Sequence, residues 1–449
     1  MVQRLRDPIH DLIEFDDSLL DRIAWKLIAS RPFQRLRRIR QLGFSEFVFP
    51  GATHTRFSHS IGVFHNARIL CQVLKEKLGP NFCQESADVA VIAALIHDLG
   101  HGPFSHAFES ALGQKGRHEQ YTAEFIDNED INRILCEYDK SFPDKIKLIF
   151  QSDQVLNIYS SIVSSQFDAD RLDYMQRDRM MSGTKLGSID LTWLMRNIEV
   201  SQIPIGVDGE KIADVDTLVL GEKSLWAGEG YVLSLFHLYP AVYLHKTTRG
   251  AEKLFSLLMT SIKSLVDERN GEATGLPDTH PLLTYLRNPK LDNYAHLDDA
   301  VIWGALPMLS KSKDGLVAQC AEDLLYRQLW EAIDLKCLRN DNDPPGEPTE
   351  AEVRFKQFMQ QRTQEQQDWG VRVLEDSYTR DPYKRQEYGS SKSLDKIHIL
   401  REGKPKDLAQ VSPVVGALKK FKVNRLYIRR EDTDAREMIQ GWIREARNA

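Results

Sequence analysis

Hydrophobic residues recur at helical spacing through most of the first 180 residues. Within "DSLLDRIAWKLIAS" (17–30) they form a single stripe, which predicts an amphipathic helix. "SADVAVIAALIHD" (86–98) is apolar on nearly every face, which predicts a buried central helix. Helices should therefore dominate this part of the chain.

The spacing changes to alternation between about Ile189 and Gly221. This segment contains "VDGEK" (207–211), a turn signal, so we predict a short β-hairpin. A helical pattern returns from Lys223 to about Asp267. Pro240 should kink or break that helix, because proline lacks the N–H that an interior helical residue donates.

The last hundred residues have a mixed pattern. "RFKQFMQQRTQEQQDWGVRVLED" (354–376) is polar with helical spacing, and "TDAREMIQGWIREARN" (433–448) predicts a closing helix. "DKIHILRE" (395–402) and "NRLYIRRE" (424–431) predict strands. Gly-, Asp- and Pro-rich stretches near 267–281 and 340–350 are typical of loops or boundaries. We divide the chain into a core (1–270), a helical extension with loops (271–350) and a C-terminal α+β region (351–449).

Composition restricts the class of protein. The 449 residues are many for one compact core, and the net charge of −6 argues against general nucleic-acid binding. Five scattered cysteines without a C-x-x-C pair argue against a disulfide framework and favour a reducing compartment. Because the N-terminus lacks an apolar signal core and no apolar run approaches the length of a membrane span, we expect a cytoplasmic protein without membrane partners.

The densest chemistry lies in "ALIHDLGHGPFSHAFE" (94–109). His97 and Asp98 end the apolar helix, and Gly100 is suited to a left-handed C-terminal position. An imidazole and a carboxylate at a helix end can share a metal, and this donor pair suits Fe, Mn, Zn or Co. Histidines so close to a buried helix are costly unless they are paired or metal-bound.

Two other segments could complete a metal site. "GATHTRFSHSIGVFHNA" (51–67) supplies His59 at the start of an amphipathic helix. "QFDADRLDYMQRD" (166–178) places Asp170, Tyr174 and Asp178 on one helical face. Asp170 can then close a site with His59, His97 and Asp98 and leave positions open for water and substrate. Taken singly, each histidine fits an ordinary polar side chain better, and the charged helix fits a solvated face.

Phosphoester hydrolysis also needs proton transfer and cations. His101 and His106 follow the helix end on a Gly-Pro loop, and His118 and Glu119 begin the next helical segment, so these four residues could form a proton relay. The alternative for each is a helix cap or a hydrogen bond that supports a neighbour. Arg56 and Arg171 are near the metal candidates and could hold phosphate oxygens.

"GATHTRFSHS", "IHDLGHGPFSHAFE", "RHEQY" and "DADRLDYMQRD", in this order, resemble the HD-domain phosphohydrolases, in particular the deoxynucleoside triphosphate triphosphohydrolases. The resemblance extends from about Asp7 to Ser182 and more weakly to Thr248. It implies a mostly α fold with a helical HD core, and it implies the metal ligands and the four-residue proton relay given above. His106 would be the general acid, and Glu109 stands where the animal enzyme has aspartate. Sugar-binding positions would be Gln41, Tyr174, Asp178 and Tyr243, with Arg56 and Arg171 at the phosphates.

The same resemblance implies a dNTP substrate, a divalent transition metal that Mg²⁺ can accompany, a nucleotide activator and a homo-oligomer (dimer or tetramer). Three departures from the family pattern limit what the resemblance implies, and one of them is the absence of the lysine expected near Gln3. Ser30 stands where the animal enzyme has an activator-reading aspartate, and Leu235 stands where it has a phosphate-binding arginine; Lys246 or Arg249 could substitute for that arginine.

Two other functions remain open from the sequence. An HD phosphohydrolase could act on a monophosphate, a cyclic nucleotide or another phosphoester, and an HD module could bind nucleotide or nucleic acid without catalysis. The intact metal set and proton relay favour an enzyme, and Arg56, Tyr174 and Asp178 favour a dNTP.

Overall fold

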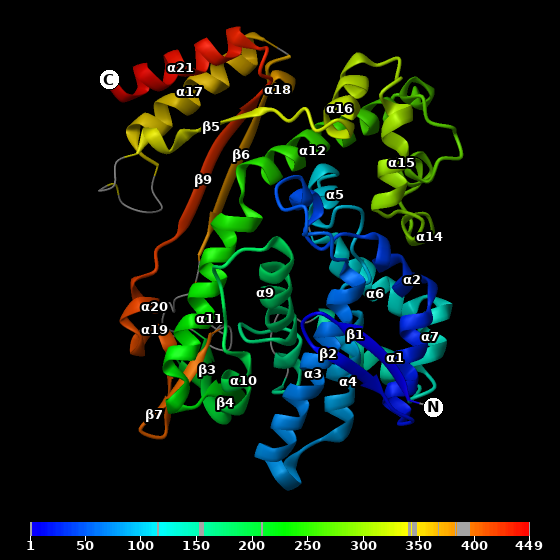
Figure 1. Ribbon diagram of the computed structural model, residues 1–449, viewed down its shortest axis with the longest axis vertical. Helices are drawn as coiled ribbons and strands as arrows, with labels where there is room; N and C mark the ends of the chain where they lie inside the picture. The colour runs from blue at the N-terminus through cyan, green and yellow to red at the C-terminus, as the bar shows by residue number, and fades with distance from the viewer. Residues whose placement is uncertain are drawn as a thin grey trace.

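The computed structural model describes residues 2–114, 116–151, 157–207, 210–339, 343, 348–366, 368–381, 383 and 396–448, with side chains for all of these except 205–213. Helices make up most of this part of the chain, as predicted (Figure 1). The helices up to Ser182 are α1 (Leu19–Ala29), α2 (Arg31–Arg35), α3 (Arg56–Leu78), α4 (Gln84–Ile96), α5 (His106–Ala111), α6 (Arg117–Asp127), α7 (Glu129–Leu135), α8 (Phe142–Gln151) and α9 (Ala169–Ser182).

The N-terminal half is built around α3, which packs against both α4 and α9. Every residue of α4 from Ala87 to Ile96 is buried, which confirms the predicted central helix. The predicted amphipathic helix is α1: Ser18 caps it by accepting from the Asp21 N–H, and Ile23, Leu27 and Ile28 are buried. A small antiparallel hairpin, β1 (Gln3–Asp7) and β2 (Asp11–Phe15), precedes α1.

The predicted β-hairpin is present as β3 (Ile198–Val207) and β4 (Glu210–Leu220), after α10 (Leu191–Arg196). Residues 208 and 209 of its predicted turn lie outside the described residues. The hairpin joins two strands from much later in the chain, because β4 pairs in parallel with β7 (His398–Arg401), which pairs with β8 (Lys404–Asp407). A C-terminal segment therefore lies against the first half of the protein.

Pro240 interrupts the helix, as predicted. Helix α11 (Leu225–Leu238) ends two residues before it, and a π-helical turn (Tyr239–Tyr243) follows before α12 (Lys246–Asp267). The Leu244 N–H donates to the Tyr239 carbonyl at 2.8 Å, a wider turn than an α-helix makes. The turn brings Tyr239 and Tyr243 to one side, with ring centroids 5.0 Å apart.

Among the described residues, four α-helices (α13 to α16) lie between α12 and β5, and the later part of the chain contains a third sheet in the order β5–β9–β6. The predicted helix over 354–376 is wrong in its last part: α17 ends at Glu365, and residues from Val373 form a strand whose buried positions alternate at its start. The remaining elements are α13 (Pro281–Arg287), α14 (Leu291–Tyr294), α15 (Asp299–Leu309), α16 (Gly315–Leu325), β5 (Glu331–Asp334), α17 (Glu350–Glu365), α18 (Trp369–Arg372), β6 (Val373–Arg380), α19 (Leu408–Val411), α20 (Pro413–Ala417), β9 (Phe421–Ile428) and α21 (Thr433–Asn448).

Two hydrophobic cores hold these elements. One extends from Ile13 to Tyr427 in sequence, and a smaller one joins α17, α18 and α21 to the sheet of β5, β9 and β6. The division at 270 and 350 stays a prediction. Among the described helices, none has the length and apolar character that crossing a membrane requires.

Candidate active site

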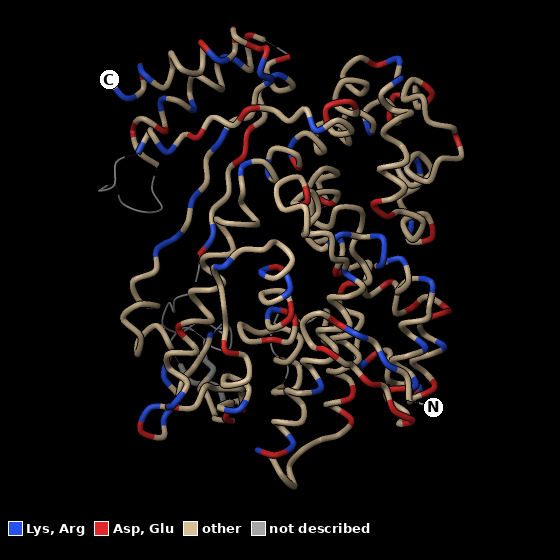
Figure 2. Tube along the Cα trace, viewed as in Figure 1, with Lys and Arg blue, Asp and Glu red and all other residues tan. Residues whose placement is uncertain are grey.

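Three helices converge on one point. His59 lies in the first turn of α3, His97 and Asp98 directly follow α4, and Asp170 lies in the first turn of α9. Figure 2 shows acidic and basic residues close together along α9. Because α3 packs against both other helices, its first turn meets the end of α4 and the start of α9, and the four predicted metal ligands come together.

The donor atoms of these four residues lie within a few ångströms of one another. His59 Nε2 is 3.0 Å from Asp170 Oδ1 and 3.8 Å from Asp98 Oδ2. His97 Nε2 is 3.3 Å from Asp98 Oδ1 and 3.9 Å from Asp170 Oδ1. Two nitrogens and two carboxylate groups around one point are a donor set for a divalent transition metal.

The second ring nitrogens of both histidines support this interpretation. His59 Nδ1 donates to Asp173 Oδ2 at 2.8 Å, and His97 Nδ1 donates to the Ala94 carbonyl at 2.8 Å. Because a carboxylate and a carbonyl can only accept here, each Nδ1 carries the proton and each Nε2 keeps its lone pair for the site. His59 Nε2 is buried and lacks a hydrogen bond of acceptable geometry. The residues present therefore fit a metal ion.

The site has a surplus of negative charge. Burial by itself lowers the pKa of His59, but the nearby carboxylates of Asp170 and Asp173 outweigh it and raise that pKa to about 10. Burial opposes ionisation of Asp98, yet the charge of Arg56 lowers its pKa well below the ordinary value. The same negative surroundings that favour a proton on His59 also favour a cation between the four ligands.

Beside this site lies a cluster of three histidines, and His101 links the two, because its Nε2 is 3.2 Å from Asp98 Oδ1. The rings of His101 and His118 stack at 4.2 Å, and His106 lies 4.9 Å from His101 and 5.1 Å from His118 between ring centroids. Glu109 Oε2 accepts from His118 Nδ1 at 2.9 Å. Glu119, the fourth residue of the predicted relay, is exposed, and among the described residues the carboxylate of this cluster is that of Glu109.

Gly100 is needed for a reason other than the predicted one. Its φ is not positive, so the left-handed position is wrong; instead Phe104 (φ 51°) and Ser105 (φ 56°) have positive φ. A Cβ at Gly100 would lie 1.9 Å from the His118 carbonyl oxygen and 2.5 Å from the Thr122 nitrogen. The absence of a side chain thus lets the first turn of α6 pack onto the motif and brings His118 to the cluster.

The two predicted phosphate cations are both engaged with carboxylates. Arg56 is buried and donates through Nη1 to Asp98 Oδ2 (2.5 Å) and through Nε to Ser105 Oγ (2.8 Å). Arg171 donates to Asp168, the residue that caps α9. These contacts hold the end of α4 and the start of α9 in place and partly neutralise both cations.

The predicted sugar-binding residues lie on α9, on the π-helical turn and on the segment before α3. Asp178 accepts from Tyr243 Oη (2.8 Å) through one oxygen and contacts His54 Nε2 (2.8 Å) through the other. The rings of Tyr174 and Tyr243 lie edge to face at 6.4 Å. The side-chain oxygen of Gln41 is buried and accepts no hydrogen bond from any described residue.

Asp173 is the residue that sequence reasoning missed. It is fully buried on α9 and contacts His10 Nε2 (2.7 Å) and Arg177 (2.8 Å) in addition to His59. Through His10, the N-terminal hairpin takes part in the positioning of His59, a predicted metal ligand. The sequence contained one signal for this role. Asp173 follows Asp170 by three residues, so both side chains lie on neighbouring parts of the same helix face.

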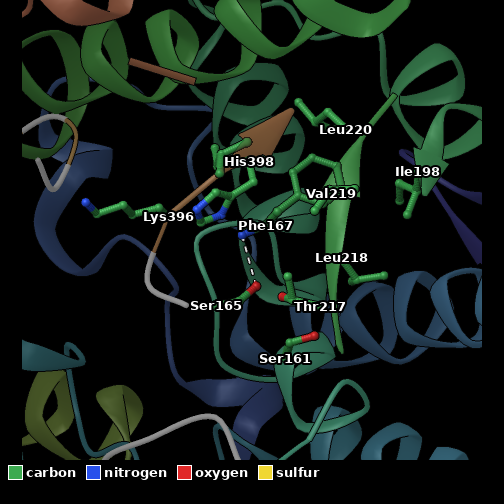
Figure 3. A pocket seen from close by; sticks show the side chains of 11 residues that line it. Ser161, Ser165, Phe167, Ile198, Thr217, Leu218, Val219, Leu220, Lys396 and His398 are labelled. Atoms are coloured by element: carbon green, nitrogen blue, oxygen red, sulfur yellow. Dashed lines mark hydrogen bonds between the residues drawn. The ribbon is translucent and has the colours of Figure 1, made fainter. Parts of the chain in front are cut away.

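A separate cavity lies behind the segment that leads into α9. It is lined by three residues of that segment, by Ile198, by β4 and by residues 396–398, and Figure 3 shows Ser165, Phe167 and His398 among the side chains around it. His398 is buried, and its Nδ1 has no hydrogen-bond partner among the residues that the structure describes. None of the predicted site residues lines this cavity.

Comparison with known proteins agrees with the geometry. Residues 56–175 match the family model described as HD domain. The chain is 29% identical to the uncharacterized protein YwfO of Bacillus subtilis over 416 residues. The matched region covers 92% of this chain and 88% of that protein. It is also 38% identical to the deoxynucleoside triphosphate triphosphohydrolase SAMHD1 of Xenopus laevis over 175 residues. This match covers 36% of this chain and 26% of the Xenopus protein.

A crystal structure of a phosphohydrolase from Bacteroides thetaiotaomicron has a TM-score of 0.74 and 26% identity, and the match covers 96% of this chain and 100% of that one. The matched HD segment contains all four predicted metal ligands, from His59 to Asp170. The chain therefore contains an HD domain at residues 56–175, has the fold of the Bacteroides phosphohydrolase, and is similar over part of its length to a deoxynucleoside triphosphate triphosphohydrolase.

Proposed function

We propose that this protein hydrolyses deoxynucleoside triphosphates to deoxynucleoside and inorganic triphosphate in a metal-dependent reaction. The observation that carries the proposal is the junction at Asp98, where a two-histidine, two-carboxylate donor set adjoins a cluster of three histidines. A site for a metal and a site for proton transfer lie side by side, as phosphoester hydrolysis requires.

His59, His97, Asp98 and Asp170 would hold the metal, which we propose is Fe, Mn, Zn or Co, with Mg²⁺ as a companion. Such an ion, when bound, polarises phosphate oxygens and lowers the pKa of water. Asp173 and the Ala94 carbonyl keep the Nε2 lone pairs of the two histidines directed at the site. These contacts orient the ligands before substrate arrives.

His106 is the proposed general acid for the leaving sugar oxygen. Its ring keeps contact with solvent, yet the loss of hydration among its neighbours and the nearby His101 and Arg56 lower its pKa. The ring is therefore neutral in the substrate-free protein at neutral pH. A bound triphosphate brings negative charge beside it, which raises the pKa and places a proton where the leaving group needs one. In this proposal His118, held by Glu109, and His101 line the reaction centre; Glu119 stays an untested member of the relay.

Asp178, Tyr174, Tyr243 and Gln41 would hold the deoxyribose. Tyr243 is fixed by its hydrogen bond to Asp178, so its ring should leave no room for a ribose 2′-hydroxyl. We expect kcat/KM to be much higher for dNTPs than for NTPs. Tyr243→Ala should lower the ratio of kcat/KM for dNTPs to kcat/KM for NTPs. An unchanged ratio would remove Tyr243 from sugar selection.

We also propose that GTP is not an obligatory activator and that the protein forms a dimer or tetramer in the cytoplasm. Ser30 lacks the carboxylate of the family's activator site, and its hydroxyl donates to the Leu27 carbonyl at 2.6 Å at the end of α1. Linear initial rates on one dNTP without GTP are the expected result. Strict dependence on added GTP would contradict this part of the proposal.

The central experiment supplies the metal-free protein with Fe²⁺, Mn²⁺, Zn²⁺ or Co²⁺ and offers each dNTP, each NTP, dAMP and a cyclic nucleotide. Ion-exchange chromatography identifies the products, and deoxynucleoside with intact tripolyphosphate is expected. Asp170→Ala should lose bound metal and turnover together, whereas Asp88→Asn, a buried carboxylate elsewhere on α4, should keep both. Release of orthophosphate, or action on monophosphates alone, would favour another phosphoester as substrate.

A further inference from the structure

The arginines around α9 and α12 differ in one respect. Arg56, Arg171 and Arg249 each form an ion pair with a buried carboxylate. Arg380, the last residue of β6, has no carboxylate within ion-pair distance in the described part of the chain. Its guanidinium lies over the ring of Tyr239, 3.7 Å from the centroid. This positive charge is therefore oriented by an aromatic ring and not neutralised by an acid.

The surroundings of Arg380 are apolar. It lines a small cavity together with Leu235, Phe236, Tyr239 and Phe421, its partner in the β6–β9 register. Strands β6 and β9 run side by side from the C-terminal helices toward α11, as Figure 1 shows, so a residue of the C-terminal region reaches the helix that carries Leu235. Among the described residues, the cavity lining contains no acidic side chain, so the charge of Arg380 stays available to an anion.

Arg380 is connected to the proposed nucleotide site through a short row of tyrosines. Tyr239 contacts Tyr243 at 5.0 Å between ring centroids, and Tyr243 donates to Asp178 on α9. The charges of Arg380 and of Asp170, one of the four metal ligands, both act on the Tyr239 hydroxyl. The aromatic row thus extends from the face of α9 that carries Asp170 and Asp178 to the unneutralised guanidinium.

We propose that Arg380 binds the outer phosphates of the nucleotide, a role that rests on the proposed function. A triphosphate needs cations beyond the metal, and an arginine without a carboxylate partner can contribute its full charge and its planar fork of donors. Arg249 is occupied by Asp376 and Glu252, and Lys246 is exposed at the start of α12. The phosphate contact that α11 lacks at Leu235 comes instead from a strand of the C-terminal region.

The test measures substrate dependence in the metal-loaded full-length protein. Arg380→Ala should raise KM for a dNTP about tenfold or more, the equivalent of one lost hydrogen bond to a charged group, and change kcat far less. Binding of inorganic tripolyphosphate, measured by calorimetry, should weaken in parallel, while bound metal stays unchanged. Arg380→Lys should restore part of both because it keeps the charge. Arg429→Ala is the control, since Arg429 also lies over an aromatic ring but next to Ile428, the residue at the other end of the β6–β9 register.

The two proposals fail in different ways. If the wild-type protein hydrolyses no dNTP, the proposed function is wrong. If it does, but Arg380→Ala leaves KM and tripolyphosphate binding unchanged, the phosphate role of Arg380 is wrong. A purely structural role would lower the melting temperature of Arg380→Ala and change kcat, without weakening tripolyphosphate binding in the folded variant, and this result would also overturn the inference.

Discussion

Replacement of Asp173 by asparagine tests whether its carboxylate sets the state of a metal ligand. Asp173 is fully buried, and its two oxygens contact four nitrogens: His59 Nδ1, His10 Nε2, and Nε and Nη2 of Arg177, at 2.7–2.8 Å. Asparagine has the same shape but only one acceptor oxygen, and its amide would face a donor. The donors around one of the two former carboxylate oxygens must therefore lose their hydrogen bonds.

Two magnitudes follow from these contacts. Loss of one member of a buried ion pair typically destabilises a protein by 3–5 kcal/mol, but Arg177 keeps Asp7 at 2.9 Å, so we expect about 3 kcal/mol. Loss of the carboxylate behind a metal-binding histidine typically weakens metal affinity by about 10–100-fold. The second effect arises because His59 is no longer held with its proton on Nδ1.

Urea unfolding of the metal-free protein gives the first quantity, and competition with a chelator gives the second. Asp88→Asn is the matched control, because Asp88 is also buried in the HD core, where it accepts from Tyr138 Oη at 2.5 Å. This control should lose stability and keep its metal affinity. If Asp173→Asn loses stability but binds metal as tightly as the wild type, the carboxylate does not orient His59 and the reasoning is refuted.

Three further predictions can be checked separately. Gly100→Ala should displace the first turn of α6, because its Cβ would lie 1.9 Å from the His118 carbonyl oxygen. We expect kcat to fall about 100-fold while the metal is retained. Gly304→Ala, with nothing within 4 Å of its Cβ, should leave kcat unchanged in the same assay. Normal turnover in Gly100→Ala would contradict the packing argument. His106→Ala should keep metal and nucleotide but lose about 10²–10⁴-fold in turnover, measured by single-turnover kinetics; near-normal turnover with weakened nucleotide binding would make it a positioning residue. Burial raises the pKa of Asp299 to about 7, so between its ordinary value of 3.8 and that value the native state holds a proton that the unfolded chain has lost, and the free energy of unfolding should fall as pH rises. Asp299→Asn should flatten this decline in urea melts from pH 4.5 to 7, and an unchanged slope would assign the proton elsewhere.

Local patterns were sufficient for most helices and for the four candidate metal ligands that the structure brings together. The buried helix 86–98 and the break at Pro240 follow from side-chain periodicity and from backbone chemistry, which act within a few residues. The helix predicted through residue 376 is interrupted after Glu365 and is wrong from Val373, because that segment pairs with β9, about 50 residues later. Strand pairing at that distance leaves no periodic signal in the helix that precedes it.

The sequence by itself determined which residues could bind a metal, since histidine and carboxylate types at helix ends carry that chemistry wherever the helices lie. Only the tertiary structure decided which atoms meet. Asp173 supports His59 because α3 packs against α9, and Glu109, with Glu119 exposed, joins His118 because Gly100 admits the backbone of α6. Arg380 reaches Tyr239 because β6 runs beside β9 to α11. These contacts join residues 9 to 141 positions apart, and hydrogen bonds, charge and packing act through space and not along the chain.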